Sequence, residues 1–383
     1  MEINNRVLFL DTRPIRRGAQ VFVHDLKTRF KEDGIAVKRV FLYKELNYDN
    51  LALDETDIVL PFTDNNIFEK FPTVHPRIII ELAKEIKLFS PNIILCNGSK
   101  TLKYAAAVKR FYPSIKSKLV YRVIDSAVYW NRKSLTQLYY KYWVIPSMDA
   151  AVGVSQRSLD EMIQHYSFTK PSVCIPRAVD IDYFANYIPE AYAKKEVGIP
   201  ENAFVLLFLG NFTNQKRPDR FIDIINLVKE SIPYVHGLMV GDGPLRSAIY
   251  EQISSLSLEN NITCVGYKQD VRPWIAMSDV LLLTSDTEGM PGVVLEAAAM
   301  KKTTVCGNVG GVSEFIENYN NGILITSQLI NDYKDSIIEI CYNRNKLNKY
   351  NLITEQKVRN FYNISLVYGS YKEYFDKLIK NIF

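Results

Sequence analysis

The sequence predicts an α/β protein built from two doubly wound, Rossmann-like domains. The chain has 383 residues, more than the ~100 to 200 that one domain usually contains. Short β-branched and apolar runs alternate with helical patterns in both halves, which is typical of parallel sheets covered by helices on both faces. The halves are separated by a polar segment at 180–200, which contains Pro189, Gly198 and Pro200.

Each half offers six or seven short strands followed by helical patterns. The expected strands are 7–11, 37–43, 58–60, 93–97, 119–124, 150–154 and 173–175, then 204–209, 237–240, 262–265, 280–284, 303–306 and 323–325. We assign 1–185 to an N-terminal domain, 186–360 to a C-terminal domain, and 361–383 to an amphipathic helix that crosses back to the N-terminal domain. Ligands of open α/β sheets bind outside the carboxyl ends of the strands, so we expect the two domains to face each other across a cleft.

The composition fits a soluble enzyme, with 47% hydrophobic and 23% charged residues. Residues 1–6 lead into the first strand without a secretory signal pattern, and no apolar run approaches the ~20 residues of a membrane span. We therefore expect a cytoplasmic protein whose membrane contacts are peripheral. The five cysteines are scattered singly and are interpreted as small buried residues, not as disulfides or metal ligands.

The net charge of +5 is unevenly distributed along the chain. Residues 1–180 contain 27 basic and 19 acidic side chains, and the remainder contains 20 and 23. Between 86 and 143, eleven basic residues occur with one acid, Asp125, and with many aromatic residues. This mixture fits an anionic membrane surface, where each Lys or Arg adds ~1 kcal/mol of binding. A solvated basic face is the alternative, and nucleic acid is disfavoured because no binding motif accompanies the charge.

The segment 284–300 carries the most chemical information. A polar loop with Glu288 follows a strand, and a Pro-Gly pair then opens a helix. The unbonded amides of Gly292 and Val293, together with the positive helix end, predict a phosphate site. Glu296 is the only polar residue of this helix, so its carboxylate must meet either a polar ligand, such as the two hydroxyls of a ribose, or an internal ion-pair partner.

Two glutamates separated by seven residues, in the setting E-G-x-P-x-x-x-L-E-A, resemble the signature of family 4 of the retaining glycosyltransferases. Other elements of that family follow in order: G-D-G-P-L-R at 241–246, V-G-Y at 265–267, M-S-D-V at 277–280 and G-G at 310–311. The similarity covers residues 203–326. It implies a GT-B fold, a nucleotide-diphosphate sugar as donor and transfer with retention of the anomeric configuration.

The resemblance also implies roles for individual residues. Glu296 would bind the donor ribose, Glu288 the hydroxyls of the transferred sugar, and the amides of Gly292 and Val293 the diphosphate. Lys216 matches the family lysine that neutralises the departing diphosphate, which is sensible because cations stabilise developing charge; an ordinary surface lysine is the alternative. The remaining donor-side residues implied are Gly243, Gly266 and Tyr267.

The sequence departs from the family pattern at two positions. Asn211 stands where relatives usually have an arginine, and Arg217 is a candidate substitute for it. A His-Asp pair common in relatives is here Ile124-Asp125, so Asp125 remains a candidate to position the acceptor hydroxyl or the sugar. Its alternatives are a structural partner of Arg122 or a helix cap. Gly18 and Arg122 are the other residues expected on the acceptor side.

The expected mechanism is front-face substitution, in which the departing diphosphate takes the proton of the incoming hydroxyl and no protein nucleophile takes part. Neither a metal nor a cofactor is expected, and the donor is expected to be of the UDP or GDP type. The acceptor is expected to be a glycan or lipid-linked precursor of a cell-surface polysaccharide. Competing hypotheses are a non-catalytic nucleotide-sugar-binding scaffold, a nucleotide-sugar epimerase and, disfavoured by the absent glycine fingerprint, a nicotinamide dehydrogenase.

Overall fold

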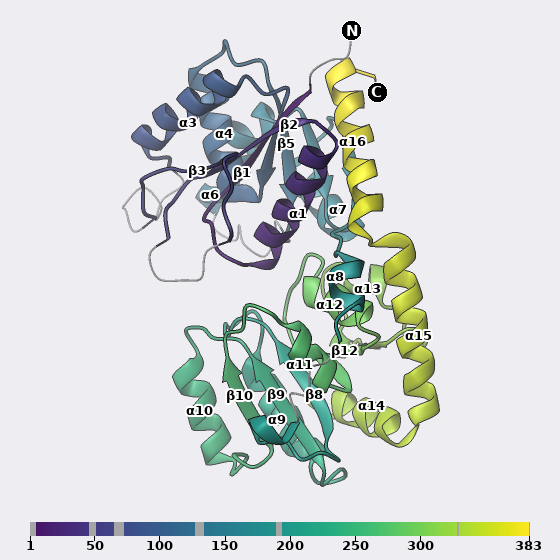
Figure 1. The fold of residues 1–383 in the computed structure, drawn as a ribbon. Helices are drawn as coiled ribbons and strands as arrows, with labels where there is room; N and C mark the ends of the chain where they lie inside the picture. The colour runs from purple at the N-terminus through teal and green to yellow at the C-terminus, as the bar shows by residue number, and fades with distance from the viewer. Residues whose placement is uncertain are drawn as a thin grey trace. The chain divides into compact units, whose positions relative to one another are not determined.

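The computed structural model describes residues 5–45, 51–64, 73–126, 134–188, 194–327 and 329–382. The chain divides into two compact units, Met1–Arg177 with Ile364–Phe383, and Ala178–Asn363 (Figure 1). The division precedes the boundary at 185 that the sequence suggested, because helix α8 (Ile181–Ala185) packs against α12 (Gly292–Ala299) of the second unit. The last helix, α16 (Ile364–Lys380), packs against α1 (Gly18–Glu32) of the first unit.

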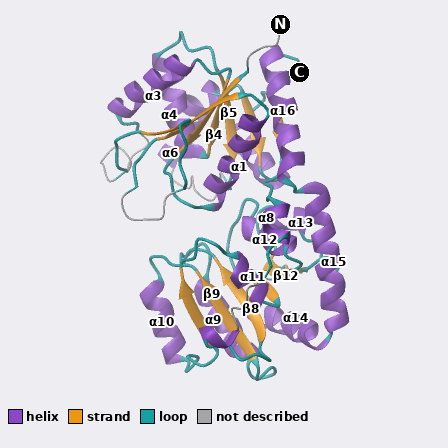
Figure 2. Ribbon diagram, in the orientation of Figure 1, coloured by secondary structure: helices purple, strands orange, loops and turns teal. Residues whose placement is uncertain are grey.

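Seven parallel strands form the sheet of the first unit, in the order β3-β2-β1-β4-β5-β6-β7. Figure 2 shows the strands of both units in orange and their helices in purple. Their bounds are β1 Arg6–Asp11, β2 Ala36–Phe41, β3 Asp57–Val59, β4 Ile93–Asn97, β5 Lys118–Val123, β6 Ala150–Gly153 and β7 Ser172–Cys174. These ends lie within two residues of the expected ones. The strand order reverses between β1 and β4, which is the doubly wound topology that the sequence predicts.

Helices cover both faces of this sheet because successive side chains of a strand point to opposite sides. Leu8 and Leu10 of β1 face a core shared with α3 (Pro76–Phe89) and α4 (Ser99–Phe111). Phe9, between them, faces α1 and α16, where its ring lies 5.9 Å from Phe30, which stacks on Phe375 at 5.7 Å. The remaining helices described are α6 (Ser134–Tyr139), a π-turn η1 (Tyr140–Val144), a short 3-10 turn η2 (Ile145–Ser147) and α7 (Gln156–Tyr166).

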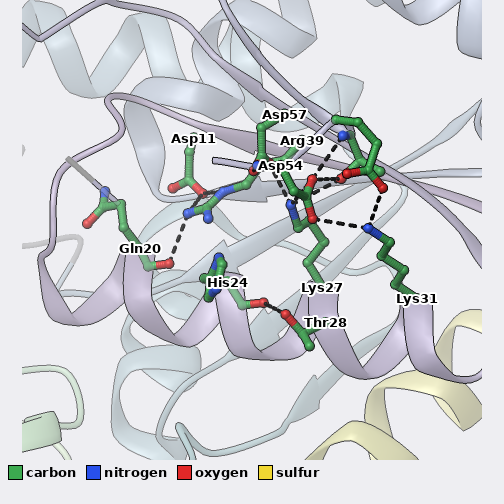
Figure 3. A network of polar contacts seen from close by, with 11 residues as sticks. Asp11, Gln20, His24, Lys27, Thr28, Lys31, Arg39, Asp54 and Asp57 are labelled. Carbon is green, nitrogen blue, oxygen red and sulfur yellow. Dashed lines mark hydrogen bonds and ion pairs between the residues drawn. The ribbon is translucent and has the colours of Figure 1, made fainter. Parts of the chain in front are cut away.

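A buried polar chain crosses the first sheet beneath α1 and α16 in the order of its strands. Arg39 of β2 binds Asp11 of β1, and Asn97 of β4 donates to the same carboxylate at 2.5 Å. Arg122 of β5 donates to Asn97 at 2.9 Å and to the hydroxyl of Tyr371 of α16 at 3.2 Å. Figure 3 shows the Asp11–Arg39 part of this chain. Buried charges are tolerated only with such partners, so the network ties the C-terminal helix to the sheet.

The second unit contains a six-stranded parallel sheet, in the order β10-β9-β8-β11-β12-β13. Its strands are β8 Phe204–Leu209, β9 Val235–Val240, β10 Ile262–Gly266, β11 Val280–Leu283, β12 Thr303–Gly307 and β13 Ile323–Ile325. Its helices, besides α8 and α12, are α9 Pro218–Val228, α10 Arg246–Ser255, α11 Arg272–Met277, α13 Val312–Phe315, α14 Ile330–Tyr342 and α15 Arg344–Phe361, with a short 3-10 turn η3 at Lys194–Val197. Both sheets therefore match the expected fold class.

An aspartate fixes the start of one interior strand in each sheet. The Asp279 carboxylate accepts the amide of Val205 at 2.8 Å, and the Asp279 amide donates to the Val205 carbonyl at 2.9 Å. Asp149 makes the same pair of bonds to Leu119 in the first unit, at 2.7 and 2.8 Å. In the second unit this contact sets the register of β11 against β8, whose carboxyl ends carry the loops described next.

Candidate functional site

Five loops of the second unit meet at the carboxyl edge of its sheet. They follow β8 (210–217), β9 (241–245), β10 (267–271), β11 (284–291) and β12 (308–311). All six strands are parallel, so their carboxyl ends share one edge, and the strand order reverses between β8 and β11. Such a switch point is where ligands of open α/β sheets bind.

The G-D-G sequence lets the β9 loop lie directly on the β8 loop. A Cβ atom on Gly241, whose φ is +147°, would stand 1.9 Å from the carbonyl oxygen of Gly210. One on Gly243 would stand 2.6 Å from the oxygen of Phe212, whose amide is itself bonded to Asp242 at 2.9 Å. Gly243 is therefore needed for the packing of these two loops.

The structure brings together Lys216 and Glu288, which lie 72 residues apart in the sequence. The Lys216 ammonium nitrogen is 2.5 Å from Oε1 of Glu288, and the Ser285 hydroxyl donates to the same oxygen at 2.7 Å. Glu288 is buried, and the lysine is about one quarter exposed. A cation and a carboxylate thus share the centre of this edge. The role of Ser285 was missed from the sequence, although its place three residues before Glu288 in a polar loop is a usable signal.

Two glycines support the backbone of Glu288 from the β12 side. Gly310 has a φ of +53°, and a Cβ atom there would stand 1.6 Å from the Glu288 carbonyl oxygen. The amide of Gly311 donates to the carbonyl of Gly289 at 2.7 Å. The G-G pair therefore determines where the Glu288 loop can lie.

The structure places Arg217, the candidate substitute for the missing arginine, against two carboxylates. Its guanidinium donates through Nε and Nη2 to Asp219, and through Nη1 to Asp286 at 3.4 Å. Partial burial is the largest single effect on Asp219 and raises its pKa, but the hydrogen bond and charge of Arg217, together with backbone hydrogen bonds, hold the Asp219 pKa below its ordinary value. The same bond raises the pKa of Arg217. Asn211 is exposed at the end of β8.

The helix α12 begins at the edge as expected, with one shift. Pro291 is the N-cap residue and not the first helical residue, which is Gly292. Gly292 is buried, and Val293 and Glu296 are half-buried. The first amides of a helix have no partner within it, so Gly292 and Val293 present donors at the positive helix end. Glu296 follows one turn later.

The end of β10 supplies the other predicted donor-side residues. Gly266 has a φ of +70°, and its carbonyl accepts the amide of Gly241 at 2.9 Å. Tyr267, next to it, is 43% exposed. An exposed aromatic ring at this edge of the sheet is suited to contact with a flat base.

The acceptor-side candidates belong to the first unit. Asp125 is half-buried just after β5, at the carboxyl edge of that sheet. Arg122 is 1% exposed and bound to Asn97 and Tyr371, so it lies in the core and does not present its guanidinium to a ligand. Gly18 opens α1, and a Cβ atom there would stand 2.3 Å from the Arg177 guanidinium. Only glycine permits that contact without movement of the arginine.

Two absences among the described residues bear on metals and membranes. No group of three or more His, Cys, Asp or Glu side chains among them could hold a metal ion. Within the same residues, no helix has both the length and the apolar character to cross a bilayer.

Comparisons with known proteins match both units. Residues 190–357 match the family described as "Glycosyl transferases group 1", and 16–183 match "Glycosyltransferase Family 4". The chain is 26% identical over 211 residues to the UDP-Gal:alpha-D-GlcNAc-diphosphoundecaprenol alpha-1,3-galactosyltransferase of Escherichia coli, covering 54% of each chain. It is 28% identical over 191 residues to the N-acetyl-alpha-D-glucosaminyl L-malate synthase of Bacillus anthracis, covering 47% of this chain and 49% of that one. The chain thus spans about half the length of these relatives.

A solved structure shows the same fold over almost the whole chain. The crystal structure of HepE from Anabaena in complex with UDP-glucose superimposes with a TM-score of 0.79, at 18% identity, over 97% of this chain and 99% of that one. At that identity the likeness shows the two-sheet GT-B fold alone.

Proposed function

Because the chain belongs to the group 1 and family 4 glycosyltransferases, we propose that it is a retaining hexosyltransferase that uses a UDP- or GDP-sugar donor. The observation that carries this proposal is the Lys216–Glu288 pair at 2.5 Å, beside the first amides of α12. The galactosyltransferase relative is named for a UDP-sugar, and HepE was crystallised with one. Nothing in these comparisons favours the scaffold, epimerase or dehydrogenase.

The donor would lie along the carboxyl edge of the second sheet. We assign the diphosphate to the amides of Gly292 and Val293 and to Lys216, the ribose hydroxyls to Glu296, and the sugar hydroxyls to Glu288. Lys216 and the helix amides supply positive charge where the leaving group becomes more negative, without a metal ion. Glu288 is buried and bonded to Lys216 and Ser285, which suits it to binding hydroxyls better than to attack on the sugar.

The proposed reaction breaks the bond between C1 of the sugar and the diphosphate oxygen, and forms a bond from C1 to the acceptor oxygen on the same face. The acceptor proton passes to the departing diphosphate, so no protein base is required. Asp125 remains the candidate on the acceptor side to orient the incoming hydroxyl. The protein contributes positioning and electrostatic stabilisation.

Donor binding is the first test of this proposal. UDP, GDP, ADP and CDP are titrated calorimetrically against the wild type, Glu296→Ala and the control Glu251→Ala, which changes an exposed glutamate of α10. We expect one nucleotide to bind, Glu296→Ala to weaken it at least ~10-fold because a charged hydrogen bond is lost, and the control to bind normally. Absence of binding by every nucleotide at millimolar concentration would overturn the proposal.

Transfer to an added acceptor separates the transferase from its rivals. An epimerase would release an isomerised nucleotide sugar without acceptor, and a scaffold would bind the donor without turnover. NMR of the product decides whether the anomeric configuration is retained. Undiminished turnover in EDTA is expected, and loss of turnover that a divalent cation restores would contradict metal independence.

Some of the basic side chains of the stretch at 86–143 are buried or ion-paired in the structure. Lys103 and Arg122 are 5% and 1% exposed, and Lys109 is ion-paired with Asp149. The part at 127–133 lies outside the described residues. The basic face expected from the sequence is therefore smaller than the count of eleven suggests.

A more specific candidate for membrane binding is an exposed apolar surface on α6 and η1. Leu135, Leu138 and Tyr142 are 73%, 50% and 68% exposed, and their spacing of three and four residues places them on one helical face. The Tyr140 hydroxyl donates to the carbonyl of Ser99, at the start of α4, so this surface lies towards the carboxyl edge of the first sheet. Residues 126–148 contain three basic residues and no acid. We assign this surface to an anionic lipid bilayer at the cytoplasmic face, which would bring a lipid-linked glycan acceptor to the enzyme.

Liposome sedimentation tests the membrane assignment. The double variant Leu135→Glu/Leu138→Glu is compared with Leu88→Glu, which changes an equally exposed leucine at the end of α3. The double variant should lose binding to anionic vesicles and keep normal donor binding, whereas the control should keep both. Equal sedimentation of all three proteins would remove the membrane surface and leave the transferase proposal intact.

A further inference from the structure

The loop that carries Lys216 is held by hydrogen bonds from the loop that carries Glu288, and we propose that Thr284 is the residue that positions Lys216 for action on the leaving diphosphate. This inference rests on the proposed function. Thr284 is the first residue after β11 and is completely buried. Its hydroxyl bonds to the backbone of Lys216 and not to the ammonium group, so it acts through the lysine's backbone.

The Thr284 hydroxyl lies between two consecutive carbonyl oxygens of the Lys216 loop. Its Oγ1 is 3.0 Å from the carbonyl oxygen of Lys216 and 2.9 Å from that of Arg217. A single hydroxyl hydrogen is shared between these two acceptors, and no other side chain type of similar size offers the same donor without a backbone shift except serine. The bond fixes the peptide from which the lysine side chain projects.

Two further bonds continue this contact along the loops. The amide of Asp286 donates to the carbonyl of Gln215 at 2.9 Å, and the Gln215 side-chain amide donates to the carbonyl of Thr287 at 3.0 Å. Three consecutive carbonyls, those of 215, 216 and 217, therefore accept from residues 284 and 286. These hydrogen bonds fix the alignment of the Lys216 loop against the Glu288 loop.

This contact is needed because the Lys216 loop ends in a strained turn. Arg217 has a φ of +51° and precedes Pro218, a position that disfavours this conformation for any residue with a Cβ atom. Arg220, largely buried in α9, supports the other side by donating to the Thr284 carbonyl and to Asp286, each at 2.7 Å. Thr284 is thus held on its carbonyl and holds the turn through its hydroxyl.

The effect of Thr284 on catalysis follows from when Lys216 is needed. Charge on the diphosphate grows as the sugar departs, so a displaced ammonium group loses more of its contact with the transition state than with the bound donor. Loss of the hydroxyl should therefore lower kcat about 10- to 100-fold while the donor KM changes by less than about threefold. A purely structural role predicts a lower melting temperature and no such split.

The test compares Thr284→Val, which keeps the shape and removes the hydroxyl, with Thr284→Ser, which keeps the hydroxyl. Each is made in the wild type and in a Lys216→Met background, and kcat, donor KM and melting temperature are measured. We expect Thr284→Ser to keep kcat within about threefold, and Thr284→Val to change kcat less than about twofold once Lys216 is absent. An equal loss from Thr284→Val in both backgrounds would overturn the inference.

A second variant guards against unfolding of Thr284→Val. Gln215→Met removes the bond to Thr287 from a half-exposed side chain, and it should lower kcat in the wild type but not in the Lys216→Met background. Failure of the proposed function gives a different result: Lys216→Met would then transfer sugar as fast as the wild type, or the wild type would bind no nucleotide. If Lys216→Met lowers kcat as expected but Thr284→Val and Gln215→Met lower kcat equally in both backgrounds, the positioning role is rejected and the proposed function stands.

Discussion

Replacing Gly310 by alanine should lower kcat, although the native glycine has no side chain that could contact the substrate. The new Cβ atom would stand 1.6 Å from the Glu288 carbonyl oxygen, and real Cβ contacts stay beyond 3.0 Å. The Glu288 backbone must therefore move by about 1.4 Å. Misplacement of a reacting group by about 1 Å can lower turnover about 100-fold. Alanine at φ +53° adds a conformational penalty of about 1 to 2 kcal/mol.

Gly198→Ala is the matched control for the conformational penalty. Gly198 has a φ of +76° and is exposed, and no atom lies within 4 Å of the position that a Cβ atom would take, so only the backbone cost applies there. Transfer kinetics and thermal unfolding are measured for both variants. We expect both to melt earlier and only Gly310→Ala to lose kcat. Equal kcat values for the two variants would refute the argument that Gly310 sets the position of Glu288.

Three further results are expected. Burial lowers the His236 pKa to about 4, against an ordinary 6.5 in the unfolded chain. Between these two values the unfolded state takes up a proton that the folded state excludes. The free energy of unfolding therefore falls as the pH drops from 6.5 towards 4. In His236→Gln, the loss of unfolding free energy between pH 6.5 and 4 should be smaller by on the order of 3 kcal/mol, measured by urea unfolding at several pH values in this interval. The same pH dependence in the wild type and the variant would contradict this prediction. Tyr371→Phe removes the acceptor of the buried Arg122 Nε and should lower the free energy of unfolding by about 1 to 3 kcal/mol in urea. Asn211→Arg should tighten nucleoside diphosphate binding about three- to tenfold by calorimetry, and unchanged affinity would show that this position does not face the diphosphate.

The fold was predictable because its signal is local and repeated. Most interior strands are short, largely apolar runs buried on both faces, so their positions follow from composition and their ends from the flanking polar residues, whereas the edge strands β3, β7 and β10 are partly exposed. The domain boundary was less predictable. The polar segment at 180–200 suggests a boundary at 185, which leaves 178–185 in the N-terminal domain. Helix α8 instead belongs to the second unit because it packs on α12, a contact between segments about 110 residues apart that leaves no local pattern.

The candidate site was predictable where chemistry requires a residue type at a fixed spacing. Glu288 lies in the loop before α12 and Glu296 lies one turn inside that helix, and their fixed spacing is visible in the sequence. The partners of Arg217 and Arg122, in contrast, could not be predicted from sequence spacing. Both are cations near the expected sites, and both are bound by partners, Asp219 and Tyr371, that only the three-dimensional structure identifies.

The position of the Lys216–Glu288 pair is determined by contacts between loops, both between the two loops that carry it and with the loop after β12. The turn after Lys216 is strained, and the Glu288 carbonyl lies where only a glycine at 310 leaves room. Thr284 joins the two loops, Gly310 lies against the Glu288 loop and Gly243 lies against the loop that carries Lys216; we call Thr284, Gly310 and Gly243 the frame of the pair. Substitutions should therefore have unequal effects: exposed Asn211 can tune affinity, whereas a change inside the frame moves the cation and the carboxylate apart. The Thr284 hydroxyl and the Asp286 amide hold the Lys216 loop through its backbone carbonyls, so neither bond uses the Lys216 ammonium group, whose partner is Glu288.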